Sequence, residues 1–117
     1  MQPFISVIIP VYNIEWYIGK CLDSVIDQTL KDIEIIVVND GSTDNSPEII
    51  ARYADKDSRI VVIDKSNEGL AYARKSGIEA AQGEYIQHLD GDDFLEPDAI
   101  ELLYNKAIEE KADMVVF

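Results

Sequence analysis

The chain has 117 residues, enough for one domain with a single hydrophobic core but too few for two. Hydrophobic residues make up 47% of it, which argues against disorder, and its formal net charge of −13 argues against nucleic acid as a partner. A single cysteine, Cys21, excludes an internal disulfide and favours a reducing compartment. No secretory signal is visible and no apolar run approaches the roughly 20 residues that cross a bilayer, so a cytoplasmic protein is expected.

Apolar runs of strand length alternate with segments of helical periodicity along the chain. Strands are expected at residues 4–9, ending at Pro10, and then at 33–38, 59–64, 84–89 and 113–117. A first helix is expected at 15–28, and a second begins after an N-cap at Asp44, with Pro47 early in it. A third is expected at 69–82 with Gly83 at the C′ position, and a fourth from Pro97 to about 110. This alternation predicts an α/β fold with a mostly parallel sheet and helices on both faces.

The segments that follow the first four predicted strands should meet at one edge of the sheet. In parallel sheets, ligands bind beyond the carboxyl ends of the strands, near the point where the strand order reverses. Here these segments read PVYN, NDGSTD, KSNEG and DGDD, and two of them are acidic. Carboxylates from separate parts of the chain are therefore expected to converge on one rim.

The segment DGDD, residues 90–93, places three carboxylates within four positions of an already acidic chain. Such close like charges repel one another, so a fold that tolerates them usually supplies a shared counter-ion. Asp90 and Asp92 can turn to one side while Gly91 lets the backbone approach, and oxygen ligands of this kind suit Mg²⁺ or Mn²⁺. Because such a metal also binds substrate phosphates, an acidic loop can hold an anionic diphosphate. The simpler interpretation is a solvated loop with Gly91 in a left-handed turn.

Two other carboxylate motifs can be compared with this segment. An EF-hand loop beginning at Asp90 would require glycine where Leu95 stands and would contain Pro97, so that motif is rejected. A haloacid-dehalogenase-type phosphatase also has an Asp-x-Asp pair after a strand. It carries the pair on its first strand, with a small hydroxyl or β-branched residue where this chain has Phe94, and stays a weaker alternative.

Residues at the other predicted strand ends offer further binding groups. Asp40, beside Asn39 at the tip of the second strand, can accept hydrogen bonds from a ligand. Tyr12 and Asn13, after Pro10, can form a rim that stacks on a base. Arg74 could reach a phosphate, although charged residues on an amphipathic helix are commonly only solvated. His88 is expected to pack against the fold, and Cys21 to be buried and inert.

In order and spacing, the stretches SVIIPVYN, IIVVNDGSTDNS and NEGLAYARKSGIEAAQGEYIQHLDGDD resemble the N-terminal half of family 2 glycosyltransferases with the GT-A fold, whose sheet is Rossmann-like. The resemblance covers nearly the whole chain. It implies an inverting enzyme of polysaccharide biosynthesis that moves a sugar from a nucleotide diphosphate-sugar, with UDP-sugar favoured, to a hydroxyl of a glycan or lipid-linked acceptor. Mn²⁺ or Mg²⁺ would be the cofactor.

The same resemblance implies roles for individual residues. Asp90 and Asp92 would form the family's Asp-x-Asp pair, with Asp92 the direct metal ligand and Asp93 a reserve. Asp40 would hydrogen-bond the base. The residues expected to bind the nucleotide-sugar are Pro10, Val11, Tyr12, Asn13, Asp40, Arg74 and Asp90.

Residues 1–117 are thus expected to be the donor-binding part of a domain truncated before its acceptor half. In this family the general base and most of the acceptor site lie downstream of the segment that corresponds to Phe117, so the catalytic base is unassigned and the piece is expected to be inactive alone. The MVVF strand is expected to let two copies associate. Peripheral attachment of the full-length protein to a membrane stays open, as does a non-catalytic nucleotide- or cation-binding module.

Overall fold

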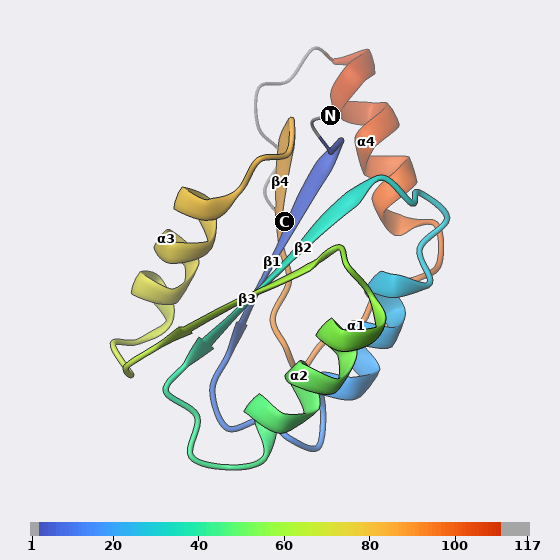
Figure 1. The fold of residues 1–117 in the computed structure, drawn as a ribbon. Helices are drawn as coiled ribbons and strands as arrows, with labels where there is room; N and C mark the ends of the chain where they lie inside the picture. Colours follow the sequence, from blue (N-terminus) through green and yellow to red (C-terminus); the bar gives the residue numbers. More distant parts are fainter. Residues whose placement is uncertain (1–2, 111–117) are drawn as a thin grey trace.

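The structure is a computed structural model that describes residues 3–110. Its parallel sheet contains β1 (Ile5–Val11), β2 (Ile33–Asp40), β3 (Ile60–Lys65) and β4 (Tyr85–His88), in the spatial order β3-β2-β1-β4 (Figure 1). The helices are α1 (Ile18–Ile26), α2 (Ser46–Lys56), α3 (Leu70–Ala80) and α4 (Ala99–Glu109). The α/β fold with a parallel sheet is confirmed. The predicted strand at 113–117, and the self-association expected from it, lie outside the described residues.

The chain moves outward from β1 through β2 to β3 and then returns to place β4 on the other side of β1. The strand order therefore reverses between β1 and β4. Residues with register partners on both sides, such as Ile8 opposite Ile36 and His88, make β1 a central strand. This reversal lies beside the acidic segment that follows β4, as the rule for open parallel sheets requires.

Alternating side chains along β1 build two apolar layers. Val7, Ile9 and Val11 belong to a buried core that includes residues of α1, α2 and α4. On the opposite face, Ile8 meets Gly77 of α3 so closely that a Cβ at Gly77 would collide with the isoleucine side chain. Figure 1 shows α3 on one side of the sheet and the other helices across from it. Burial on both faces explains why β1 is a continuous apolar run.

The expectation that Pro10 ends the first strand is wrong, because β1 continues through it to Val11. The carbonyl of Ile8 accepts a hydrogen bond from the Leu89 N–H at 3.0 Å, so the backbone polar groups of Ile8 face β4. Those of Pro10, two residues later, face the same way. Since pairing with β4 ends at His88, the N–H that proline lacks has no ladder partner to lose.

The first two helices begin later than the sequence predicts. Residues 13–15 donate their backbone N–H groups to side chains of residues 42–46 and lie before α1, which starts at Ile18 instead of residue 15. The N-cap of α2 is Asn45 instead of Asp44. Asp44 still supports the helix start, because its Oδ1 accepts from the Ser46 N–H at 2.9 Å. Local capping chemistry therefore identified a residue that supports the helix start, but placed the N-cap one position too early.

Glycine is needed at position 83 for a different reason from the predicted one. Helix α3 ends at Ala80, so Gly83 is not its C′ residue. Its N–H donates to Ser6 Oγ at 2.8 Å, and a Cβ on Gly83 would lie 2.6 Å from the Ser6 nitrogen. The same serine hydroxyl donates to a carboxylate oxygen of Glu34, which also accepts from the Gln82 N–H. The connection from α3 to β4 therefore packs directly on β1.

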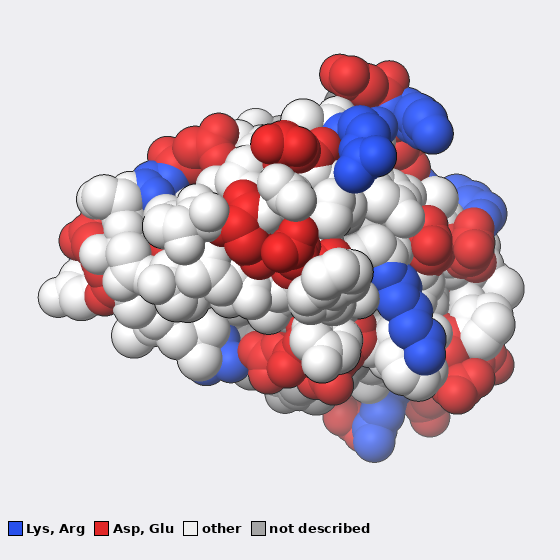
Figure 2. Space-filling model, turned by 90° about the horizontal axis from the view of Figure 1, so that it is seen from below, with Lys and Arg blue, Asp and Glu red and all other residues white. Residues whose placement is uncertain are grey.

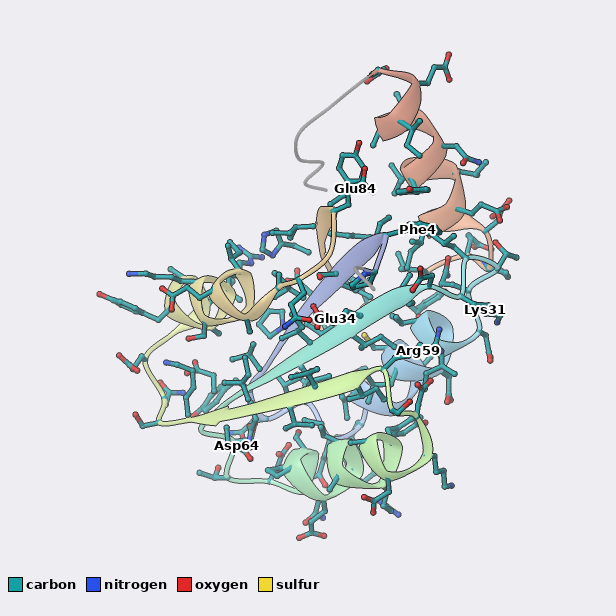
Figure 3. The ribbon with its side chains drawn as sticks, turned by 45° about the horizontal axis from the view of Figure 1, so that its top comes forward. Phe4, Lys31, Glu34, Arg59, Asp64 and Glu84 are labelled. Atoms are coloured by element: carbon teal, nitrogen blue, oxygen red, sulfur yellow. The ribbon has the colours of Figure 1, made fainter. Side chains whose placement is uncertain are left out.

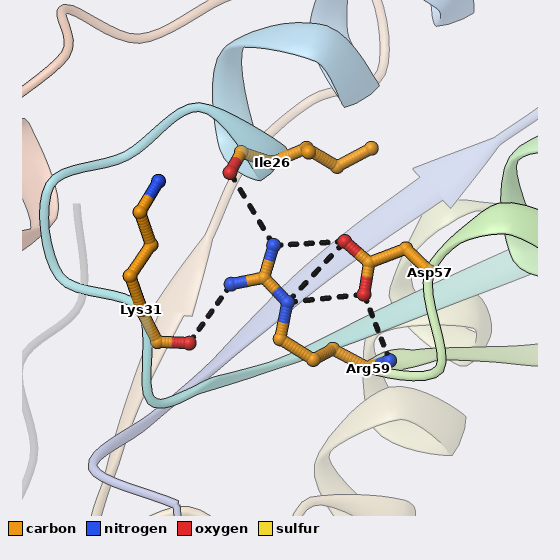
Figure 4. Close-up of polar contacts among 4 residues, drawn as sticks. All are labelled: Ile26, Lys31, Asp57 and Arg59. Carbon is orange, nitrogen blue, oxygen red and sulfur yellow. Dashed lines mark hydrogen bonds and ion pairs between the residues drawn. The ribbon is translucent and has the colours of Figure 1, made fainter.

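Arg59 joins three segments at the amino ends of the strands (Figure 4). Its guanidinium donates to the carbonyls of Ile26 at 3.3 Å and Lys31 at 2.8 Å, and to both carboxylate oxygens of Asp57. Figure 3 shows Arg59 and Lys31 at this end of the sheet and Asp64 at the opposite end. The end of α1, the approach to β2 and the turn before β3 are thus held by one side chain.

We expect Asp57→Asn to lower the free energy of unfolding by about 1–2 kcal/mol at pH 7, because charge-assisted bonds to Arg59 become weaker. Hydrogen bonds from Arg59 hold the pKa of Asp57 below its ordinary value of 3.8. The stability that this carboxylate contributes is therefore complete above that value and is lost as pH falls through the lower folded pKa. Urea unfolding between pH 2.5 and 7 should show a flatter pH dependence for the variant, and parallel curves would contradict the assignment.

Candidate functional site

Four strand ends meet at one edge of the sheet, the lower edge in Figure 1, and Figure 2 shows the molecule from that side. Acidic side chains gather across the middle of this face. Two cavities lie here, one lined by Asp40 at the end of β2 and one by Asp90 after β4. Successive residues of α3, Ala73 and Arg74, line the first and the second cavity respectively, so the two adjoin. The predicted convergence of carboxylates on one rim is confirmed.

Residues 90–93 form a tight turn directly after β4. The Asp93 N–H donates to the Asp90 carbonyl at 3.0 Å, which brings the two ends of the turn together. Asp90, Asp92 and Asp93 are all exposed, and each offers a carboxylate oxygen within 4.8 Å of the others. Three convergent, exposed carboxylates are the donor set that hard divalent cations take, so these residues fit Mg²⁺ or Mn²⁺.

Glycine stands at position 91 because the turn leaves no room for a side chain there. Among the glycines of residues 3–110, only Gly41 and Gly69 have a positive φ, so the left-handed turn considered for Gly91 does not occur. A Cβ on Gly91 would collide with the Ile14 side chain and lie 3.1 Å from the Pro10 carbonyl oxygen. The acidic turn therefore rests directly against the end of β1.

The cavity beside the acidic turn has a volume of about 340 Å³. Arg74 Nη2 lies 3.1 Å from Asp90 Oδ1, an exposed ion pair that adds little stability and leaves both groups accessible. Burial and the positive charge of Arg74 lower the pKa of His88 below its ordinary value, and Asp90 partly offsets this effect. The side-chain amide of Gln87 is buried and has no hydrogen-bond partner within the described residues. This cavity thus combines the guanidinium of Arg74, carboxylates and neutral polar side chains.

The other cavity, of about 330 Å³, surrounds Asp40. Its lining comprises Pro10, Val11, Tyr12, Asp40, Asn67, Gly69, Leu70 and Ala73. Asp40 is buried, and its two oxygens accept from the N–H groups of Glu68 at 2.9 Å and Gly69 at 3.0 Å. Lys65 Nζ lies 3.8 Å from the same carboxylate. Each oxygen retains a lone pair, so the carboxylate can still accept a bond from a ligand.

Asn13 and Asn39 join loops at this rim. Asn13 adopts a left-handed conformation with φ of 51°, and its Oδ1 accepts from the Thr43 N–H at 2.7 Å. Asn39 donates to Asp64 Oδ1 at 3.0 Å and accepts from the Ser42 N–H at 3.1 Å. Asn13 is not among the residues that line either cavity, whereas Pro10, Val11, Tyr12, Asp40, Asp90 and Arg74 each line one.

Sequence reasoning missed several residues that line the two cavities, including Asn67, Leu70 and Gln87. Gln87 carries a detectable signal, because a polar residue interrupts an apolar strand that is otherwise suited to burial. Asn67 and Leu70 carry none, since a turn asparagine and a helix-start leucine are ordinary. Their place at the site depends on how the β3–α3 connection folds back toward β1.

A larger cavity, of about 610 Å³, lies between α1 and α2, and Trp16, Tyr53 and Lys56 are among the residues that line it. None of the four strand-end segments contributes to this lining. Two of its carboxylates are already engaged, Asp23 by the Tyr53 hydroxyl and Asp57 by Arg59. Size alone does not define a site, so we assign the candidate site to the rim, where several polar groups converge.

Comparison with known proteins agrees with this arrangement. The family model for glycosyl transferase family 2 matches residues 6–117. The chain belongs to glycosyltransferase family 2. Glycosyltransferase GlyA of Streptococcus pneumoniae is 51% identical over 112 residues, which cover 96% of this chain and 16% of GlyA. The chain spans between 12% and 42% of the length of the curated relatives compared with it.

Two solved structures share this fold. TarS of S. aureus, in a complex with UDP-GlcNAc, superposes with a TM-score of 0.85 at 29% identity over 92% of this chain and 32% of that one. The mannosyltransferase PcManGT of Pyrobaculum calidifontis, in a complex with GDP-Man and Mn²⁺, gives 0.79 at 27% identity over 96% of this chain and 33% of that one. Among residues 3–110 of this family 2 chain, no helix combines the length and hydrophobicity that crossing a bilayer requires.

Cys21 lies behind the acidic turn, with Sγ 3.8 Å from the Asp90 carbonyl oxygen. Burial raises the pKa of this thiol to about 12, and the negative charges of Asp93, Asp92 and Asp90 add to the effect.

We expect the Cys21 thiol of the folded chain to react with a disulfide reagent at pH 8 at least roughly a hundredfold more slowly than that of the chain unfolded in guanidinium, because only the thiolate reacts. Timed absorbance measurements test this, and rapid stoichiometric labelling of the folded chain would contradict the described packing.

Proposed function

We propose that the chain is the donor-binding part of an inverting, metal-dependent glycosyltransferase, which transfers a sugar from a nucleotide diphosphate-sugar to a hydroxyl of a glycan or lipid-linked acceptor. The observation that carries this proposal is the pair of adjoining cavities at the strand ends, one around a buried carboxylate and one beside three convergent carboxylates. Membership of family 2 supports the reaction class.

The cavity around Asp40 is proposed to take the nucleoside. Pro10, Val11 and Tyr12 form one wall, and Tyr12 is half exposed, so its ring is available to stack on a base. Asp40 is held by two backbone N–H groups and can accept a bond from the base. Asn13 supports this wall through its bonds to the loop at 42–44. The complexes of TarS with UDP-GlcNAc and of PcManGT with GDP-Man support a nucleotide-sugar ligand, and we favour a UDP-sugar.

Asp92 and Asp90, with Asp93 in reserve, are proposed to hold Mn²⁺ or Mg²⁺. The spacing of the three carboxylates fits a hard cation, and a chain with a net charge of −13 needs one to approach a diphosphate. The Mn²⁺ in the PcManGT complex supports this choice. When bound, the metal would stabilise negative charge on the leaving nucleoside diphosphate. Arg74, paired with Asp90, would present a guanidinium to the same phosphates.

A non-catalytic nucleotide- or cation-binding module is the alternative function. It would use the same two cavities, so binding alone does not exclude it. Transfer of sugar from a UDP-sugar by the whole protein decides between them, because a module would bind the donor and leave it intact.

We expect Asp92→Asn to weaken UDP binding in saturating Mn²⁺ at least roughly tenfold, equivalent to about 1.4 kcal/mol, because a charged metal ligand is lost. Binding of UDP without metal should be unchanged. Isothermal calorimetry measures both. Asp55→Asn, which removes the same charge from the exposed surface of α2, is the matched control. Equal UDP affinity of Asp92→Asn and the parent in Mn²⁺ would remove Asp92 from the metal site.

We expect Asp40→Asn to lower UDP affinity by about 1–3 kcal/mol whether or not metal is present, because its proposed partner is the base. In the variant an amide NH₂ group replaces one carboxylate oxygen, so either the Glu68 or the Gly69 N–H loses its acceptor. The melting temperature is therefore measured alongside the affinity. A loss of affinity that appears only with Mn²⁺ would move Asp40 to the cation site. An affinity equal to that of the parent would remove its proposed role.

A further inference from the structure

The acidic turn is followed by residues 94–98, which belong to no helix or strand. A segment of this kind has few backbone bonds of its own and needs anchors elsewhere to keep one conformation. Helix α1 and the residues just after it supply those anchors, although they lie about 70 residues earlier in the chain. The central anchor is Gln28, which follows α1 and is fully buried.

Every polar atom of the Gln28 side chain has a partner. Nε2 donates to the Glu96 carbonyl at 2.6 Å and to the Ser24 carbonyl at 3.0 Å. Oε1 accepts from the Ile100 N–H at 3.0 Å. Ile100 lies in the first turn of α4, where the N-cap residue Asp98 makes no side-chain capping bond. Gln28 therefore caps α4 from outside and holds the preceding segment at the same time.

Neighbouring groups extend the contact toward the acidic turn. Ser24 Oγ accepts from the Leu95 N–H at 3.1 Å, and the Thr29 N–H donates to the Pro97 carbonyl at 2.8 Å. Lys20 Nζ lies 4.0 Å from the centre of the Phe94 ring, within the range of a cation–π contact. Contacts from residues 20–29 thus follow the chain from residue 94 to residue 100.

We propose that Gln28, supported by Ser24, is a positioning residue that fixes the Asp90–Asp93 turn for metal and diphosphate, an inference that rests on the proposed function. Displacing residues 95–100 from α1 would take the Glu96 carbonyl and the Ile100 N–H away from the buried Gln28 amide, and leaving a buried polar group without its partners is costly. The turn is held on its other side by Gly91 against the end of β1. Gln28 itself contacts no proposed ligand, and its effect passes through the backbone.

The test compares Gln28→Met, Ser24→Ala and the parent. Methionine preserves the length and burial of the side chain but removes all its hydrogen bonds. The first measurement is the ratio of UDP affinity with Mn²⁺ to UDP affinity without it, and the second is amide hydrogen exchange of residues 89–100 without ligand. Tyr53→Phe is the control, because its hydroxyl bonds to Gly19 and Asp23 tie α2 to the same helix, away from the turn.

Gln28→Met should reduce the affinity ratio roughly tenfold, as the loss of groups that orient metal ligands does, and leave metal-free affinity within about twofold. Amides of residues 89–100 should exchange at least roughly tenfold faster, whereas those of residues 60–69 should not change. Ser24→Ala should act in the same direction and more weakly. Tyr53→Phe should lower the melting temperature and leave the ratio unchanged.

A folded Gln28→Met variant with the parental ratio and parental exchange would overturn the proposal. If Gln28→Met does not fold, Ser24→Ala decides by the same two measurements. A parent that binds UDP equally with and without Mn²⁺ would refute the proposed function instead. Exchange of residues 89–100 would still decide whether Gln28 holds the turn, and unchanged exchange in the variants would overturn that as well.

Discussion

The pairing of β1 with β2 on one side and with β4 on the other is the constraint on which the site depends. Both pairings are parallel, so the residues after β2 and β4 must leave the sheet at the same edge. Asp40 and Asp90 are therefore neighbours on one rim although 50 positions separate them in the chain. Helices cover both faces of the sheet, and Gly77, Gly83 and Gly91 stand where other segments approach this central strand closely.

The carboxylates of the rim are stabilised in two different ways. Asp40 is buried, accepts hydrogen bonds from two backbone N–H groups and lies near Lys65, so its position is set by the folded chain itself. Asp92 and Asp93 are exposed and have no salt-bridge partner within residues 3–110. One part of the rim is thus complete without a ligand, and the other, under the proposed function, would gain its counter-ion from a bound cation. This division suits a ligand whose neutral end is recognised by shape and whose anionic end is recognised through a cation.

Local pattern was sufficient for the elements and for the rim, because apolar runs, helix periodicity and the alternation of strands with helices can each be recognised in neighbouring residues. Local pattern failed where the role of a residue depends on contacts with a distant part of the chain. Pro10 stays within β1 because β4 stops short of it, and Gly83 is small because Ser6 lies against it. Gln28 looks like an ordinary polar residue at a helix end, yet its partners lie far along the chain. No window of sequence contains both members of such a pair.

The Arg59 cluster lies at the opposite pole of the sheet from the acidic rim. Within residues 3–110, the Arg59 side chain bonds only to Ile26, Lys31 and Asp57 and shares no partner with the rim. Substitutions at distant sites without shared partners have nearly independent effects on stability. Thermal robustness and ligand geometry are therefore open to separate engineering. Substitutions around Arg59, Asp57 and Lys31 offer a place to tune the melting temperature for crystallisation or biocatalysis while the rim keeps its shape.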